Sequence, residues 1–353
     1  MNYEFDLLMG APYRGGTLLM HDKELLSPHG NRVTQIDLVK GQSATLPMEC
    51  SFNARTLALS PDGRILFVID DKGRALIVNR VKRVLLHRFS FKDTVRAAKF
   101  SPGGEYLAVA VGRLVQVWTA PERRKSLAPL RLHRTYGHAH ADVTCLDWSP
   151  CGTWLAFGSR DLTVRVVSLD PVAAPGPVPK GRRALKGRRA AGAAPATYRP
   201  PTLGGFKEAP AGVWFCREHT KRAAQLAGKA PPELYTLSRD GALFAWSYVL
   251  AEGAEEEEEE EAGEGETEAE ERDREEKGDV SMDDPFSAPC VSAGPPQTTT
   301  YFKPGAHWRL TERHYVEHRG AAVSASAFDP GSGLLAVGLS SGSFSILELP
   351  ELA

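Results

Sequence analysis

Short apolar runs separated by turn residues recur along the chain. Together they form a repeated unit, in which an apolar strand, a turn, a second strand and a third strand follow one another. The copies, from clear to looser, are Leu57–Asn79, Ala97–Trp118, Cys145–Leu169, Glu233–Ser247 and Ala325–Leu349, and Gly16–Leu38 matches part of another. These runs lack the 3.6-residue period of a helix and are rich in glycine, so the pattern predicts β-strands.

The turns of the three clear copies give the repeat its length. Ser60, Ser101 and Ser149 occupy equivalent turn positions, 41 and 48 residues apart. These spacings are close to the roughly 40 to 45 residues of one blade in a WD-repeat propeller. Proline and glycine next to these serines supply the backbone angles that a tight turn requires. The prediction is an all-β WD-repeat β-propeller, incomplete, with about five to six blades.

A polar motif accompanies two of the copies. In one, Ser238 and Asp240 precede Trp246; in the other, His138 precedes Ser159 and Asp161, and Val167 stands at the tryptophan position. Buried polar groups of this kind require hydrogen-bond partners. We therefore expect His138, Ser159, Asp161, Ser238, Asp240 and Trp246 to stabilise their blades, with a partial network in the copy that lacks tryptophan.

Two polar inserts interrupt the repeats and are predicted to be disordered. The first, 171–210, is rich in Pro, Ala, Gly and Arg, and the second, 251–305, has sixteen acidic residues between Glu252 and Glu276. Neither can bury enough apolar surface to fold alone. The remaining segments are propeller blades at 1–170, one blade at 211–250, and a short helix-like segment followed by the last blade at 306–353.

Charge within the inserts leaves alternatives open. The first insert has a basic cluster of Lys180, Arg182, Arg183, Lys186, Arg188 and Arg189. Such a cluster fits a nuclear import signal, a phosphate-contacting patch or a solvated loop. The acidic block fits a solubilising spacer or a contact for basic proteins. The formal net charge of −1 averages over these opposite blocks and says little about partners.

Composition predicts an intracellular, soluble protein. The five cysteines are odd in number and widely spread, so we expect free thiols in a reducing compartment. The first ten residues lack a basic and an apolar region, which predicts no secretory signal. No apolar run approaches the roughly 20 residues of a membrane-spanning helix, so no membrane partner is expected.

Three groups of residues have the chemistry of functional sites. His138, Ser159 and Asp161 are the residue types of a hydrolytic triad, but they occupy blade positions and lack a nucleophile turn. His138, His140 and Cys145, and separately His307, His314 and His318, lack zinc-site spacing. RNA binding has modest support from a basic loop with one aromatic residue: Arg123, Arg124, Lys125, Arg131, Arg134 and Tyr136. We predict no enzyme activity, no metal and no cofactor.

An ordered set of motifs resembles one family. The set runs from Leu7, Leu8, Gly10, Tyr13, Arg14 and Gly16 through Ser27–Val33, Asp37, Leu38, Leu59–Arg64, Thr144–Trp148 and Leu234–Trp246 to Leu347–Leu352. An acidic insert after the Trp246 strand, an aromatic and basic segment at Trp308–His318 and a final repeat complete it. This arrangement resembles the periodic tryptophan protein 2 family of WD-repeat proteins, of which the chain would be an N-terminal fragment.

The resemblance implies a nucleolar scaffold. Members of that family belong to the small-subunit processome, in which WD-repeat proteins assemble with the U3 small nucleolar RNA and pre-ribosomal RNA. Early cleavages there release the small-subunit RNA. The expected partners are therefore other processome WD-repeat proteins and these RNAs, in the nucleus and nucleolus. A generic WD-repeat adaptor, such as one that presents substrates to a ubiquitin ligase, is the alternative, because the fold alone names no partner.

Overall fold

The structure is a computed structural model that describes residues 15–121, 129–169, 200–216, 232–249, 307–316, 320–329 and 332–349. All regular elements in these ranges are β-strands. One compact unit comprises Met1–Pro171, Arg199–Ser247 and Leu310–Ala353. A second unit, Val172–Tyr198 and Tyr248–Arg309, lies mostly outside the described ranges. In the described ranges, no helix has the length and apolar character to cross a membrane.

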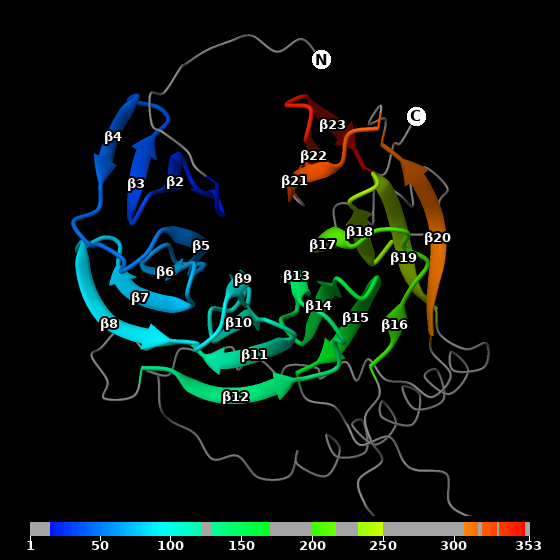
Figure 1. Cartoon of the computed structure of the whole chain (residues 1–353), viewed down its shortest axis with the longest axis horizontal. Helices are drawn as coiled ribbons and strands as arrows, with labels where there is room; N and C mark the ends of the chain where they lie inside the picture. The colour runs from blue at the N-terminus through cyan, green and yellow to red at the C-terminus, as the bar shows by residue number, and fades with distance from the viewer. Residues whose placement is uncertain are drawn as a thin grey trace, which may run out of the picture. The chain divides into compact units, whose positions relative to one another are not determined.

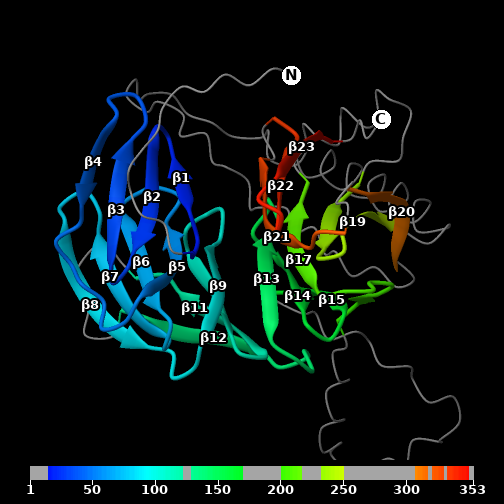
Figure 2. The same ribbon diagram turned by 45° about the horizontal axis from the view of Figure 1, so that its top comes forward.

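The strands form antiparallel sheets in chain order (Figures 1 and 2). The first sheet is β1 (Leu19–His21), β2 (Glu24–His29), β3 (Arg32–Asp37) and β4 (Gln42–Thr45), and the second is β5 (Ala54–Leu59), β6 (Ile65–Asp70), β7 (Arg74–Asn79) and β8 (Val84–Ser90). The third is β9 (Val95–Phe100), β10 (Tyr106–Val111), β11 (Leu114–Thr119) and β12 (Arg131–Tyr136). The fourth is β13 (Val143–Trp148), β14 (Trp154–Ser159), β15 (Thr163–Ser168) and β16 (Thr202–Leu203).

Two further sheets complete the described part. The fifth is β17 (Pro210–Phe215), β18 (Leu234–Ser238), β19 (Ala242–Val249) and β20 (His307–Tyr315), and the sixth is β21 (Val323–Asp329), β22 (Leu334–Leu339) and β23 (Phe344–Glu348). The first strands of successive sheets contact one another, from β5 to β9, β13, β17 and β21. The described residues thus form six blades of a β-propeller, which confirms the predicted fold class.

The turns that set the repeat share one hydrogen-bond pattern. In the second blade, the Ser60 hydroxyl accepts the Ile65 N–H at 2.9 Å and the Ser60 carbonyl accepts the Gly63 N–H at 2.8 Å. The same two contacts recur around Ser101 and Ser149 in the third and fourth blades. Gly63 has a φ of +67°, which L side chains rarely adopt. The Ser-Pro-x-Gly pattern is therefore a backbone requirement of the hairpin.

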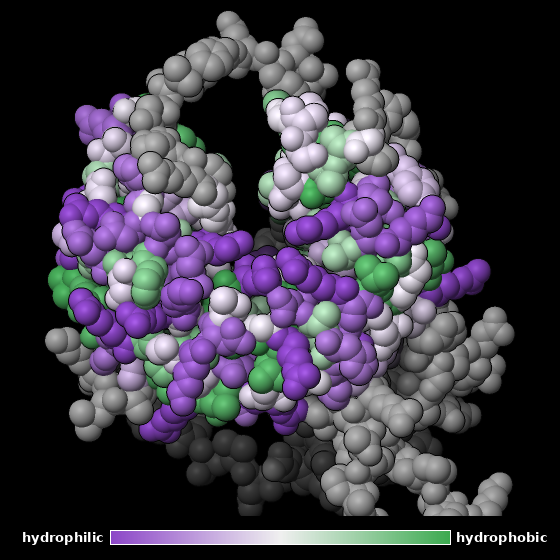
Figure 3. Space-filling model, viewed as in Figure 1, coloured by the Kyte–Doolittle hydropathy of each residue, from purple (hydrophilic) through white to green (hydrophobic). Residues whose placement is uncertain are grey.

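Apolar side chains fill the spaces between neighbouring blades. Between the second and third blades, Phe67 and Phe100 meet edge to face with ring centroids 5.6 Å apart. Similar clusters join the first blade to the second and the fifth to the sixth. Strands such as β6 and β14 are buried along their whole length, because a neighbouring blade covers each face. Hydrophilic residues with small hydrophobic patches cover the face displayed in Figure 3.

The helix-like segment predicted at the start of 306–353 is wrong, because residues 307–315 form strand β20. Side chains two positions apart share a face there: the Arg313 guanidinium lies 4.9 Å from the Tyr315 ring centroid, and His314 lies 3.3 Å from the Glu312 carboxylate. That period of two belongs to a strand. The Thr311 hydroxyl also donates to the Ala245 carbonyl of β19 at 2.9 Å. The segment after the acidic insert thus returns to the fifth blade as its outer strand.

The first insert is shorter than predicted. Residues 200–210 are described, and they include β16, which pairs with β15 of the fourth blade through Val164 and Leu203. Leu203 and Phe206 are buried, because both side chains pack into the blades. The rest of that insert, with its basic cluster, and the acidic insert 251–305 lie outside the described residues.

Gly73, in the turn between β6 and β7, gives a first stability test. Its φ is +73°, and a Cβ there would lie 1.9 Å from the Asp93 carbonyl oxygen. Replacing Gly73 by alanine is expected to lower the free energy of unfolding by about 2 kcal/mol, because both the backbone angle and the contact become strained. Urea unfolding of the purified chain measures this change.

Gly30 is the matched control, since its φ is +59° but nothing lies within 4 Å of a Cβ there. Its alanine variant should lose less, about 1 kcal/mol from backbone strain alone. Equal losses at the two positions would show that the close approach to Asp93 is not a constraint.

Candidate interaction site

The predicted motif of the fourth blade is a polar network centred on Asp161. Asp161 accepts the His140 backbone N–H and an Arg165 guanidinium N–H, each at 2.9 Å, and the Thr163 hydroxyl at 2.5 Å. The Asp161 and Arg165 side chains are 10% and 8% exposed. Burial alone would raise the pKa of Asp161, but these hydrogen bonds outweigh it and lower the pKa to about 2.

His138 and Ser159 occupy the loop and strand that flank this carboxylate. The Ser159 hydroxyl donates to the Ala141 carbonyl at 3.0 Å and accepts the Asp161 N–H at 3.3 Å. Burial, and then the charge of Arg165, lower the pKa of His138. The network has the predicted location, but sequence reasoning missed Arg165. The signal that could have identified it is its position as a lone arginine in the apolar run of β15.

The motif residues of the fifth blade also make structural contacts. The Ser238 hydroxyl donates to the Glu208 carbonyl at 3.0 Å, and Asp240 accepts the Ala242 N–H at 3.3 Å. The Trp246 indole N–H donates to the Thr236 hydroxyl at 3.0 Å. The tryptophan therefore bonds to a threonine on β18. Each of these contacts fixes the position of a strand or loop of the blade.

Asp147 joins three blades and was not singled out from the sequence. Its carboxylate on β13 lies 2.5 Å from the Lys99 ammonium of the third blade and accepts the Phe215 backbone N–H of the fifth at 3.0 Å. The neighbouring Trp148 indole N–H donates to the Lys99 carbonyl at 3.0 Å. The signal was an acid inside an apolar strand, within the motif Thr144–Trp148. This ion pair and these hydrogen bonds hold neighbouring blades in fixed positions and give the surface a defined shape.

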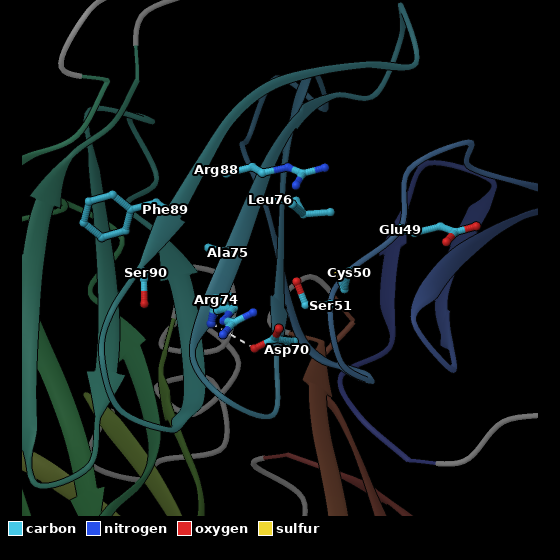
Figure 4. A pocket seen from close by; sticks show the side chains of 10 residues that line it. All are labelled: Glu49, Cys50, Ser51, Asp70, Arg74, Ala75, Leu76, Arg88, Phe89 and Ser90. Atoms are coloured by element: carbon cyan, nitrogen blue, oxygen red, sulfur yellow. Dashed lines mark hydrogen bonds between the residues drawn. The ribbon is translucent and has the colours of Figure 1, made fainter.

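A cavity of about 340 Å³ opens beside the second blade (Figure 4). Its lining comes from the loop before β5, the end of β6, the start of β7, and β8. The lining residues are Glu49, Cys50, Ser51, Asp70, Arg74, Ala75, Leu76, Arg88, Phe89 and Ser90. Backbone strands and turns on three sides fix the shape of this cavity, so it is a candidate site for an external group.

Asp70 is the buried polar group of the cavity, with 1% of its surface exposed. Its Oδ1 atom accepts the backbone N–H groups of Lys72 and Arg74, at 2.9 and 2.8 Å. Its Oδ2 atom is buried and has no hydrogen-bond partner in the described structure. Burial, together with the charge of Asp70, raises the pKa of the adjacent Cys50 thiol to about 12, so this cysteine stays neutral.

Other candidate residues are dispersed. The cluster Lys180–Arg189 and the basic residues 123–125 lie outside the described ranges. Arg131 is exposed on β12, whereas Tyr136 is buried and its hydroxyl donates to the Ser168 carbonyl at 2.7 Å. The Tyr136 ring is therefore not accessible to an RNA base, because blade packing covers it.

The described cysteines and acids give no sign of a metal centre. The four described cysteines, Cys50, Cys145, Cys151 and Cys216, are free thiols, as expected. Among the described residues, no three His, Cys, Asp or Glu side chains gather as metal ligands. Ser159 and Asp161 are engaged in blade contacts, which is the structural role that the sequence favoured over a hydrolytic triad.

Comparisons with known proteins agree with this geometry. The family described as WD domain, G-beta repeat, matches residues 130–168. A chain from the crystal structure of the mitotic checkpoint complex superposes with a TM-score of 0.56 at 12% identity, covering 99% of this chain and 84% of that chain. At this identity, the likeness shows the fold alone.

Sequence relatives are more specific. The chain is 32% identical to periodic tryptophan protein 2 of Arabidopsis thaliana and 30% identical to that of Saccharomyces cerevisiae, each over 99% of this chain. It covers 37% and 31% of those proteins, so it spans about a third of their length. The Mus musculus homologue is 38% identical over 46% of this chain and 18% of its own length. Over almost its whole length, the chain is therefore similar to the periodic tryptophan protein 2 family of WD-repeat proteins.

Proposed function

We propose that this chain acts as a non-catalytic scaffold of the nucleolar small-subunit processome. In this role it supports U3-dependent processing of pre-ribosomal RNA and assembly of the small ribosomal subunit. The observation that carries the proposal is the similarity to periodic tryptophan protein 2 over 99% of the chain, which includes both blades and connecting segments. A generic repeat match would cover the blades alone and would name no partner.

The physical character of the described residues supports a scaffold. Buried polar residues of the blades make fixed contacts, such as the Asp161–Arg165 and Asp147–Lys99 pairs, which hold strands in place. Several large apolar side chains remain exposed on the blades, among them Met20 at 70% and Phe344 at 65%. Apolar side chains on a rigid polar surface are typical centres of protein contacts. Other WD-repeat proteins of the processome are the proposed partners.

RNA contact is proposed through basic side chains and phosphates. Arg131 and His133 are exposed on the outer strand β12, and the Tyr106 ring lies 5.0 Å from the His133 ring. Phosphate contacts of this kind position RNA without reading its sequence. The proposed RNAs are the U3 small nucleolar RNA and pre-ribosomal RNA, and the proposed location is the nucleolus.

Affinity purification tests the assembly. The tagged full-length protein, expressed at its natural level, is expected to recover WD-repeat processome proteins, the U3 RNA and pre-ribosomal RNA, measured by quantitative mass spectrometry and RNA sequencing. A tagged unrelated propeller protein is the matched control. Recovery of a ubiquitin ligase core without these RNAs would contradict the proposal and favour the adaptor alternative.

A further inference from the structure

The second and fourth blades present the same backbone site with different side chains. Asp70 pairs with Ala54 in one blade as Ser159 pairs with Val143 in the other, each beside a β-bulge. The turn hydrogen bonds match as well: the Gly73 N–H donates to the Asp70 carbonyl at 3.0 Å, and the Leu162 N–H donates to the Ser159 carbonyl at 3.3 Å. Asp70 therefore occupies the position of Ser159.

The same register assigns the neighbouring positions. Lys72 stands where the fourth blade has Asp161, and Leu76, which pairs with Val68, stands where it has Arg165, which pairs with Phe157. In the fourth blade the carboxylate and guanidinium satisfy each other inside the protein. In the second blade the carboxylate, Asp70, lies on the strand instead of in the turn. An apolar side chain, Leu76, takes the place of the internal cation.

This replacement leaves a buried carboxylate facing a cavity. Asp70 is 1% exposed, and its Oδ2 atom has no partner in the described structure. A buried carboxylate oxygen without a hydrogen-bond partner is costly, so the presence of Asp70 in the lining of a cavity of about 340 Å³ points to an external donor for Oδ2. In Figure 4, Asp70 lies beside Ser51 and Cys50, with Arg74 and Arg88 on the surrounding strands.

The hydrogen bonds of Asp70 select the kind of donor. Oδ1 already accepts two backbone N–H groups, so a bidentate guanidinium would find one of its two acceptors occupied. A lysine ammonium is a point charge and needs only Oδ2. A metal ion such as Ca²⁺ would need several oxygen ligands, and the described residues group no three acidic or histidine side chains.

The rim of the cavity adds a second requirement. Arg74 and Arg88 are both exposed lining residues, and Phe52 holds the Arg74 guanidinium 5.2 Å from its ring centroid. Glu49, the acidic lining residue on the rim, is paired with Arg32. The rim arginines therefore attract an anionic group beside the cation that reaches Asp70.

We propose that this cavity of the second blade is a docking site for a partner-protein segment that inserts a lysine against Asp70 and places an adjacent acidic residue against Arg74 and Arg88. This docking site does not depend on a role in the processome, because any partner that presents such a lysine–acid segment fits it.

The test uses the full chain and a defined probe: a fluorescein-labelled, terminally blocked peptide with Lys-Glu at its centre, measured by fluorescence anisotropy. Saturable binding is expected, with acetylation of the lysine or Asp70→Asn weakening it tenfold or more. Asp71→Asn is the matched control, because Asp71 is adjacent but lies outside the cavity lining, and it should leave the affinity unchanged.

A second variant separates loss of the site from loss of folding. Arg88→Gln, on the exposed rim of the cavity, should leave the thermal midpoint nearly unchanged and weaken peptide binding severalfold, because the acidic residue of the peptide then loses one of its two cations. Absence of saturable binding, or equal affinity for the acetylated peptide, would overturn the proposal. A third result would also overturn it: oligouridylate displaces the peptide, and Asp70→Asn binds the peptide with unchanged affinity. That result would make the cavity a site for RNA phosphates.

Discussion

Replacing Phe67 by alanine is expected to lower the free energy of unfolding by about 4 kcal/mol. The Phe67 side chain is fully buried between the second and third blades, where it meets Phe100 edge to face at 5.6 Å. Truncation removes the apolar contact and leaves a cavity, because strands held by neighbouring blades cannot collapse into the space. Urea unfolding followed by tryptophan fluorescence measures the loss.

Phe344→Ala is the control for that experiment. Phe344 lies on β23 and is 65% exposed, so its truncation should change the free energy of unfolding by less than about 0.5 kcal/mol. Comparable losses for Phe67 and Phe344 would mean that the interface between blades does not carry the stability of the fold.

Replacing Arg165 by leucine is expected to cost about 3 kcal/mol, because it leaves the Asp161 carboxylate buried without its cation. Arg160→Leu, on the exposed turn next to Asp161, is the matched control and should be nearly neutral. The same urea titration compares the two variants. A neutral Arg165→Leu would show that backbone N–H groups alone satisfy Asp161.

The pH dependence of the Asp161 contribution has a defined sign. Its folded pKa, about 2, lies below the ordinary value, so its stabilising effect is complete above about pH 4 and is lost as the pH falls towards 2. The difference in unfolding free energy between the wild type and Asp161→Asn should therefore shrink over that interval. A difference that stays constant from pH 5 to 2 would contradict the assigned hydrogen bonds.

The fold was largely predictable because its signals are local. Turn serines such as Ser60 carry the hairpin geometry in a few adjacent residues, so strand runs and blade spacing could be recognised without tertiary information. Strand β20 could not be, because its charged and aromatic residues have no strong local pattern. Its state is set by the exposed backbone edge of β19, which lies far away in the sequence.

The candidate site was less predictable, because its chemistry depends on residues that the fold brings together. Glu49, Asp70 and Arg88 come from a loop, the end of an inner strand and an outer strand, and no short motif joins them. Asp70 had one weak signal, an acid at the end of a fully apolar strand. Asp147 shows the same limit, since its partners lie on two other blades.

Depletion of the full-length protein from its own cells tests the central claim most directly. Newly made ribosomal RNA would be pulse-labelled and the small- and large-subunit RNAs measured separately. A scaffold of the small-subunit processome predicts accumulation of the uncleaved precursor and loss of small-subunit RNA, with large-subunit RNA maintained and re-expression restoring the ratio. Normal production of both RNAs after complete depletion would contradict the account.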